Sequence, residues 1–229
     1  ITAYRVSEDG SVIEDVTTRK LGSNEAYVKV TRSGLCGIDK HGLKAGIALG
    51  HKGAGIVERI ETSVQSVSVG DRVGFRYIHK VCGRCENCLK GTIADSKPGM
   101  DVYCTNKSEF GSHDHDLGSF SSHTVVDADA LYGLPDGPDP AHAAPSMCGG
   151  ATVWGGLPLY GDRATDRVGV VGIGALGHRA IQFAATMGCE VVVFSSTESK
   201  RTEAIKQSNS ERKSSTLRTT SRSSKASRR

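Results

Sequence analysis

The sequence predicts two domains of different class, a β-rich domain followed by an incomplete α/β domain. Up to Leu134 the chain alternates short β-branched runs with glycine turns, a pattern typical of a barrel or sandwich. From Asp166 onward, continuous apolar runs are separated by a helical segment, as in a parallel sheet. We expect the β-rich domain to span residues 1–150, the α/β part residues 151–206, and a disordered basic tail residues 207–229.

The expected strands of the β-rich domain are short and end at turn residues such as those of Asp9–Gly10. A cysteine-rich lobe at residues 79–117 interrupts them and has little periodicity. In the second domain, Arg167–Val171, a helix over His178–Met187 and Glu190–Phe194 form one βαβ unit. The expected strands of the β-rich domain are Ser11–Glu14, Ala26–Thr31, Ile56–Ile60, Val67–Gly74 and Ser119–Val126.

Charge is distributed unevenly along the 229 residues, although the net charge is only +4. Residues 201–229 carry nine Lys and Arg against two Glu, whereas residues 1–200 carry 20 basic and 23 acidic residues. The predicted folded part is mildly acidic, so its charge does not favour nucleic-acid binding. No apolar run reaches membrane-spanning length and no signal peptide is visible, so we expect a cytoplasmic protein without a membrane partner.

Four of the seven cysteines form the pattern Cys82-x2-Cys85-x2-Cys88, with Cys104 downstream. Thiolates at this spacing can converge on one tetrahedral Zn²⁺, and four protein ligands leave no position open for chemistry. The pattern therefore predicts a structural zinc site. Unrelated free cysteines or a redox Cys-x-x-Cys pair are the alternatives, and the three evenly spaced thiols favour metal.

The motif Gly172-x-Gly174-x-Leu176-Gly177 follows an apolar strand and opens a helix, which is the context of a dinucleotide-binding turn. Hydroxyls and a cation follow the second strand, where an NAD site would place an acid, and they favour the 2′-phosphate of NADP(H). A glycine-rich turn and a solvated loop are the alternatives. The predicted cofactor-binding residues are Gly172, Gly174, Leu176, Gly177, Ser195, Ser196, Thr197 and Lys200.

Three further ligand-type residues, Cys36, His51 and Cys148, stand among glycines outside the cysteine-rich lobe. A catalytic zinc site needs three protein ligands and one open position. Spacing alone does not show that these three converge, and each could instead be a buried structural residue.

The motifs Gly34-Leu-Cys-Gly-Ile-Asp39, Gly50-His51, the cysteine lobe, Met147-Cys-Gly-Gly-Ala-Thr152 and Gly172-Ile-Gly-Ala-Leu-Gly177 occur in a fixed order. In this order they resemble the zinc-dependent medium-chain alcohol dehydrogenases. The likeness is closest to the cinnamyl-alcohol-dehydrogenase-like branch that uses NADP(H), and it covers roughly residues 10–206.

This resemblance implies a GroES-like barrel domain and a Rossmann coenzyme domain. It implies that Cys36, His51 and Cys148 hold a catalytic zinc ion, and that Cys82, Cys85, Cys88 and Cys104 hold a structural one. Asp39 would orient the ligand histidine, and His41 would take part in proton relay. The implied reaction interconverts a small alcohol and an aldehyde by hydride transfer with NADP(H), and the assembly could be a homodimer.

The sequence departs from the family pattern at four places. Ile38 replaces a hydroxyl residue that would start the proton relay, and Lys52 replaces a glutamate beside the ligand histidine. The Cys88–Cys104 gap is long, with an insert near Gly91–Met100. After about Gln207 the composition suggests a truncated or frameshifted copy. The competing hypothesis is therefore a catalytically inactive zinc-binding remnant of such an enzyme.

Overall fold

The structure is a computed structural model that describes residues 1–43, 46–90, 102–159, 163, 165–196, 198–202, 205 and 219–220. It divides into two compact units, Ile1–Cys148 and Gly149–Arg229. This boundary lies two residues before the end of the β-rich domain that we expect from the sequence. The predicted insert at Gly91–Met100 and nearly all of the predicted tail lie outside the described residues.

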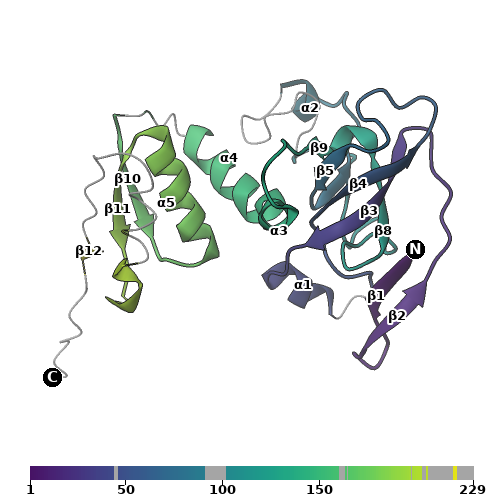
Figure 1. Ribbon diagram of the computed structural model, residues 1–229, viewed down its shortest axis with the longest axis horizontal. Coiled ribbons are helices and arrows are strands. Elements are labelled where there is room, and N and C mark those ends of the chain that lie inside the picture. The colour runs from purple at the N-terminus through teal and green to yellow at the C-terminus, as the bar shows by residue number, and fades with distance from the viewer. Residues whose placement is uncertain are drawn as a thin grey trace. The chain divides into compact units, whose positions relative to one another are not determined.

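Unit 1 is built on a five-stranded antiparallel sheet with the order β8-β3-β4-β5-β9 (Figure 1). Alternating β-branched residues form its long central strands, β3 and β4, because one face of each is buried. Two small antiparallel pairs, β1–β2 and β6–β7, complete the strands of this unit. The strands are β1 (Thr2–Val6), β2 (Val12–Val16), β3 (Glu25–Ser33), β4 (Gly53–Ile60), β5 (Arg72–Phe75), β6 (Ile78–Lys80), β7 (Ser108–Glu109), β8 (His123–Asp127) and β9 (Tyr132–Gly133).

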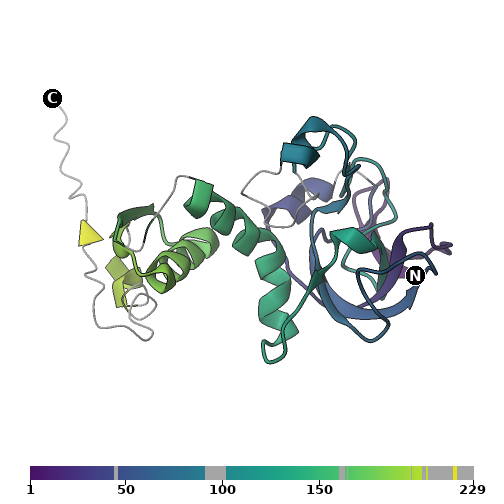
Figure 2. The same cartoon turned by 90° about the horizontal axis from the view of Figure 1, so that it is seen from above.

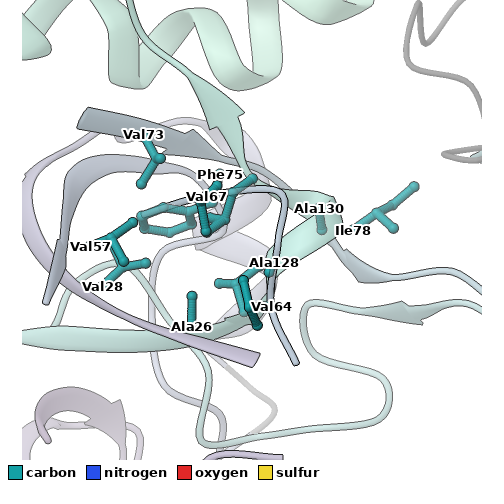
Figure 3. Close-up of a cluster of buried hydrophobic side chains, with 12 residues drawn as sticks. Ala26, Val28, Val57, Val64, Val67, Val73, Phe75, Ile78, Ala128 and Ala130 are labelled. Atoms are coloured by element: carbon teal, nitrogen blue, oxygen red, sulfur yellow. The ribbon is translucent and has the colours of Figure 1, made fainter. Parts of the chain in front are cut away.

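The core of unit 1 gathers small and β-branched side chains around the Phe75 ring (Figure 3). Val28, Val57 and Val73 come from three neighbouring strands, and each is almost fully buried. Burial of such side chains stabilises the sheet by roughly 1.5–3 kcal/mol each. The sheet is therefore a rigid support for the loops at its edge.

Short helices in unit 1 lie between the strands rather than forming a layer of their own. α1 follows β3, and α2 lies in the cysteine lobe. α3 is capped by Asp139, whose Oδ1 accepts a hydrogen bond of 2.8 Å from the Ala141 N–H, and continues into a π-helical turn, η3. The helical segments are α1 (Gly37–Gly42), α2 (Glu86–Lys90), η2 (Ala128–Ala130), α3 (Pro140–Pro145) and η3 (Ser146–Gly150).

Unit 2 contains the predicted βαβ arrangement. β10 (Arg167–Val171) pairs in parallel with β11 (Glu190–Phe194), and α5 (Ala175–Met187) joins them. Figures 1 and 2 both show α5 lying alongside these strands, and Ile181 and Ala184 of α5 are buried against Val191. The remaining elements are α4 (Ala151–Leu159), η4 (Glu198–Lys200) and β12 (Thr219–Thr220). The predicted fold class, a β-rich domain followed by an α/β domain, is confirmed.

Several element boundaries differ from the expectations. α5 begins three residues before His178 because Gly174 acts as its N-cap. β8 begins at His123 rather than Ser119. β5 is limited to Arg72–Phe75, because the preceding Gly70 has a φ of 96° and forms a turn. Thr219–Thr220 lie in the tail that we expect to be disordered, yet they pair with β11.

None of the helices within the described ranges combines the length and the hydropathy that crossing a membrane requires.

Candidate active site

The pairing of β3 with β4 brings two of the candidate ligands to one edge of the sheet. Ser33, at the end of β3, lies opposite Gly53, at the start of β4. Cys36 follows β3 closely and caps the N-terminus of α1, and His51 immediately precedes β4. The antiparallel register therefore places the end of β3 beside the start of β4, so that the side chains of Cys36 and His51 lie close together.

Asp39 fixes the orientation of His51. Its Oδ1 accepts a hydrogen bond of 2.9 Å from His51 Nδ1, and its Oδ2 accepts one of 2.8 Å from the Cys36 N–H. Because a carboxylate only accepts, Nδ1 carries the proton and Nε2 carries the acceptor lone pair of the ring. Burial acts to raise the pKa of Asp39, but the hydrogen bonds from His51 and Cys36 outweigh it and lower that pKa.

The third ligand candidate, Cys148, lies in the π-helical turn η3 that follows α3. α3 packs against β3, β4 and β5, which carries Cys148 to the same edge of the sheet. The ligand atoms of Cys36, His51 and Cys148 all lie within 4.8 Å of one another. We call these three residues the trio. Burial raises the pKa of the Cys148 thiol, and the charge of Lys52 opposes that rise without cancelling it.

The trio fits a zinc ion by its donors and by its geometry. Cys36 Sγ lies 3.4 Å from His51 Nε2. Donors around tetrahedral zinc are roughly 3.5 to 3.8 Å apart, given Zn–S near 2.3 Å and Zn–N near 2.0 Å. His51 is fully buried and Asp39 is almost so, which holds the histidine rigidly. Three ligands of this kind leave one position open.

Two residues contact His51 in ways that sequence analysis did not foresee. The ammonium of Lys52 donates a hydrogen bond of 3.3 Å to Nε2, the nitrogen that also faces Cys36 Sγ. The Phe110 ring packs against the imidazole, with ring centroids 5.7 Å apart. The sequence marks Lys52 as a departure from the family pattern, but it does not show that the side chain runs toward His51. Phe110 is far from His51 in the chain and carries no signal of its own.

The four cysteines of the lobe form a second group, which we call the cluster. The sulfur atoms of Cys82, Cys85, Cys88 and Cys104 all lie within 4.8 Å of one another. Two pairs, Cys85–Cys88 and Cys82–Cys104, have sulfurs 3.5 Å apart, which also matches tetrahedral zinc. The long gap in the sequence therefore leaves Cys104 beside the other three.

Backbone N–H groups surround the sulfurs of the cluster. Hydrogen bonds from the backbone of Cys88 and Thr105 lower the pKa of Cys85 to about 6. Backbone hydrogen bonds, first from Arg84, lower the pKa of Cys82, whereas burial raises that of Cys88 to about 12. The lowered pKa values of two of the thiols, Cys82 and Cys85, and the donated N–H groups suit a bound cation. Four protein ligands would leave a metal ion there no position open to substrate.

The glycine motif forms the turn between β10 and α5. The backbone of Gly172 has a φ of 87°, and Gly174 precedes the first helical residue. A Cβ atom at Gly177 would lie 2.0 Å from the Gly172 carbonyl oxygen, so this position requires glycine. The turn leaves the N-terminal N–H groups of a 13-residue helix available to a phosphate.

Of the predicted cofactor-binding residues after β11, Lys200 contacts this turn. Lys200 Nζ donates a hydrogen bond of 2.8 Å to the Ile173 carbonyl within the glycine motif, so the predicted cation does reach it. Ser196 and Leu176 are exposed, and Ser195 is half-buried. Thr197 and the side chain of His41 lie outside the described residues.

These features define the class: a β-rich domain with one open and one closed thiolate site, followed by a dinucleotide-binding α/β unit. The alcohol dehydrogenase GroES-like domain family matches residues 22–136. The chain belongs to this family, and its relatives confirm the predicted resemblance to zinc-dependent medium-chain alcohol dehydrogenases of the cinnamyl-alcohol-dehydrogenase type.

Two curated relatives are similar over most of this chain. An alcohol dehydrogenase of Geobacillus stearothermophilus is 34% identical over 196 residues, which cover 82% of this chain and 55% of the relative. Cinnamyl alcohol dehydrogenase 8 of Arabidopsis thaliana is 32% identical over 202 residues, which cover 82% of this chain and 54% of the relative. The chain thus spans about half the length of these relatives.

A solved structure with a similar fold comes from Sinorhizobium meliloti. It is described as a zinc-binding dehydrogenase and was solved bound to NADP. It superposes with a TM-score of 0.76 at 26% identity, covering 96% of this chain and 61% of the other. Both domain classes of the present chain are therefore found together in a dehydrogenase.

Proposed function

We propose that this chain carries the zinc- and NADP(H)-dependent interconversion of alcohols and aldehydes, with the trio as the reaction site and the cluster as a structural site. The observation that carries the proposal is the convergence of the Cys36, His51 and Cys148 ligand atoms within 4.8 Å. Family membership gives the reaction class, and the NADP-bound relative supports the cofactor.

Zinc held by the trio would supply a Lewis acid for the substrate oxygen, and NADP(H) would supply or accept the hydride. The chain's own residues prepare the site. Asp39 keeps the Nδ1 proton of His51 in place, so that Nε2 is the nitrogen that would bind the metal. Cys36 and Cys148 would bind as thiolates.

Proton transfer is the step for which this chain is least equipped. Ile38 has no hydroxyl, so the first turn of α1 offers no side-chain proton at that position. Reduction of an aldehyde consumes a proton, and oxidation of an alcohol releases one. We therefore propose that solvent exchanges this proton, with the imidazole of His41 as the nearest candidate relay along the chain.

Cofactor binding is assigned to the turn between β10 and α5. The helix N-terminus would attract the pyrophosphate, and the close contact of Gly177 with Gly172 fixes the turn. Lys200 is hydrogen-bonded at this turn, where its charge favours a 2′-phosphate. Ser195, Ser196 and Thr197 would add hydroxyl donors.

The experiment is an NADPH-consumption assay on the purified chain with benzaldehyde or cinnamaldehyde. We expect turnover by the native sequence, loss of turnover in Cys148→Ser, and no change in Cys189→Ser. Cys189 is the matched control because it is buried and belongs to neither cysteine group. A folded, zinc-loaded protein without turnover would overturn the proposal and favour the catalytically inactive remnant.

Cofactor choice is tested separately by fluorescence titration. We expect tighter binding of NADPH than of NADH, and a loss of that preference in Lys200→Gln. Tighter binding of NADH by the native sequence would contradict the assignment.

A further inference from the structure

Lys52 is a buried cation at the edge of the trio. Lys52 follows His51 directly in the sequence, and the residue is only 2% exposed. Its backbone is fixed, because the carbonyl oxygen accepts hydrogen bonds of 3.0 Å from Ser33 Oγ and 3.4 Å from the Gly34 N–H. A lysine is rarely buried this far unless its ammonium has a partner.

The aliphatic stem of Lys52 lies over Gly34. A Cβ atom at Gly34 would stand 2.5 Å from Lys52 Cε and 3.1 Å from the Pro145 Cα. No larger residue fits there without moving the lysine or α3. The absence of a side chain at Gly34 thus gives the stem its path, and that path ends at the trio.

The ammonium uses the one lone pair of His51 that a metal would need. Nδ1 already donates to Asp39, so only Nε2 can accept, and Lys52 Nζ lies 3.3 Å from it. A zinc ion bound to the same nitrogen would lie at about 2.0–2.1 Å from it. The ammonium and a zinc ion cannot both use one lone pair. Two positive charges this close to the same nitrogen also repel each other strongly where both residues are buried.

The cluster has no such competitor among the residues described around it. Lys90 pairs with Glu86 on α2, and Lys107 donates to the Val102 carbonyl and pairs with Glu109. The Cys104 sulfur instead accepts 3.4 Å hydrogen bonds from two backbone N–H groups, those of Cys82 and Asn106. Such donors stabilise thiolates without occupying the place of a metal.

We propose that Lys52 is an internal competitor for the metal of the trio, so that zinc fills the cluster first and the trio holds an exchangeable ion. This inference rests on the proposed function, because it takes the trio to be a metal site. The lysine sets how firmly the metal is held, and hence what fraction of the protein carries zinc at the trio at a given zinc supply.

The test compares metal binding by the native chain, Lys52→Met, Cys148→Ser and the double variant. Methionine keeps a flexible apolar stem over Gly34 and removes the charge. Lys20→Met is the matched control, because Lys20 is exposed and distant in sequence from the trio. Zinc content is measured after dialysis against zinc-free buffer, and Co²⁺ titration is followed by thiolate charge-transfer absorbance. The difference between each protein and its Cys148→Ser counterpart isolates the trio.

We expect the native chain and Lys20→Met to retain one zinc ion each, and Lys52→Met to retain two. The Co²⁺ affinity of the trio should rise at least about 10-fold in Lys52→Met. Two firmly held ions in the native chain, with equal trio affinity in Lys52→Met, would overturn the competition. If Lys52→Met binds no second ion even in excess Co²⁺, the assignment of the trio as a metal site fails, and the competition fails with it. The native chain's own order of filling decides the question should Lys52→Met not fold.

Discussion

The cluster and the trio use the same thiolate chemistry but are assembled in opposite ways. All four cysteines of the cluster come from one local stretch, Cys82 to Cys104, and the backbone N–H groups of Cys82 and Asn106 donate to the Cys104 sulfur. The trio gathers Cys36, His51 and Cys148 from distant parts of the chain, and the β3–β4 register and α3 bring them together. A local loop can close around a metal by itself, whereas the trio depends on the whole β-rich unit.

The difference extends to the charges that surround each group. The cluster receives neutral backbone donors and has its lysines paired elsewhere. In the trio, the carboxylate of Asp39 is hydrogen-bonded to Nδ1 of His51, and the ammonium of Lys52 is hydrogen-bonded to Nε2. These surroundings favour firm retention of an ion by the cluster. At the trio they favour exchange of the ion, as proposed above.

The largest expected effect is on the cluster. Cys104→Ser would remove a buried ligand, so we expect loss of one zinc ion per chain, because three protein ligands would hold the ion less firmly than four. We expect a fall in Tm of about 10 °C, which corresponds to a loss of about 3–4 kcal/mol of stability in a chain of this size. Zinc analysis and thermal unfolding by circular dichroism measure both. Cys189→Ser is the control with an equally buried thiol. Unchanged zinc content in Cys104→Ser would remove Cys104 from the site.

Asp39→Asn should affect the trio alone. The amide can present its NH₂ to His51 and so disturb the tautomer that frees Nε2. We expect Co²⁺ affinity at the trio to fall about 10- to 100-fold, equivalent to about 1.4–2.7 kcal/mol, with the cluster unchanged. Asp136→Asn, at a fully exposed side chain, is the control. Equal losses at both sites would mean that Asp39 supports the fold rather than the histidine.

Ile38→Thr should raise turnover without changing metal content. A hydroxyl on the first turn of α1 would offer a side-chain route for the proton, and general acid–base assistance contributes about 10²-fold or more where it is well placed. We expect an increase of about 10-fold, because the rest of the relay is not tuned to it. NADPH consumption measures the rate, with Ile13→Thr at an exposed strand position as control. No gain would indicate that proton transfer does not limit this chain.

The smallest effect concerns His79 on β6, the strand that leads into the cluster. Complete burial lowers the pKa of His79 to about 4, although Asp114 opposes this shift. Because an unfolded histidine titrates near 6.5, the unfolded state binds more protons between these values, so stability falls as pH falls through this window. We expect a loss of about 1 kcal/mol between pH 7 and 5.5 in urea unfolding.

His79→Leu should flatten that dependence, while exposed His113→Leu should keep it. An equal pH dependence in the native chain and His79→Leu would place the proton uptake elsewhere, for example in release of metal from one of the two sites.

The sequence predicts the cluster better than the trio for a physical reason. Spacing of two residues between cysteines constrains them to one place, so Cys82, Cys85 and Cys88 can be assigned without a fold. Cys148 reaches the trio only through α3 packing on three strands, and no local pattern encodes that contact. There the family resemblance, rather than periodicity, identifies the candidates. Cys104 is an intermediate case, because the long gap after Cys88 is compatible both with an intact site and with a displaced Cys104.

Side-chain contacts between residues whose meeting depends on the fold leave no pattern in the sequence. The contact of Lys52 with His51 depends on where a four-carbon stem can run, which Gly34 and Pro145 decide in three dimensions. Phe110 packs on His51 across a long stretch of chain. The βαβ unit, by contrast, follows from apolar runs and three glycines, and only the start of its helix was misplaced.

If the trio is open to substrate and the cluster is closed, an alcohol should perturb only the metal at the trio. The most direct test is the visible spectrum of Co²⁺-loaded protein, with the metal in excess, as benzyl alcohol is added. We predict that the d–d bands of the native chain shift with the alcohol and that those of Cys148→Ser, which retains only the cluster, do not. The same shift in both proteins, or none in the native chain, would contradict the account.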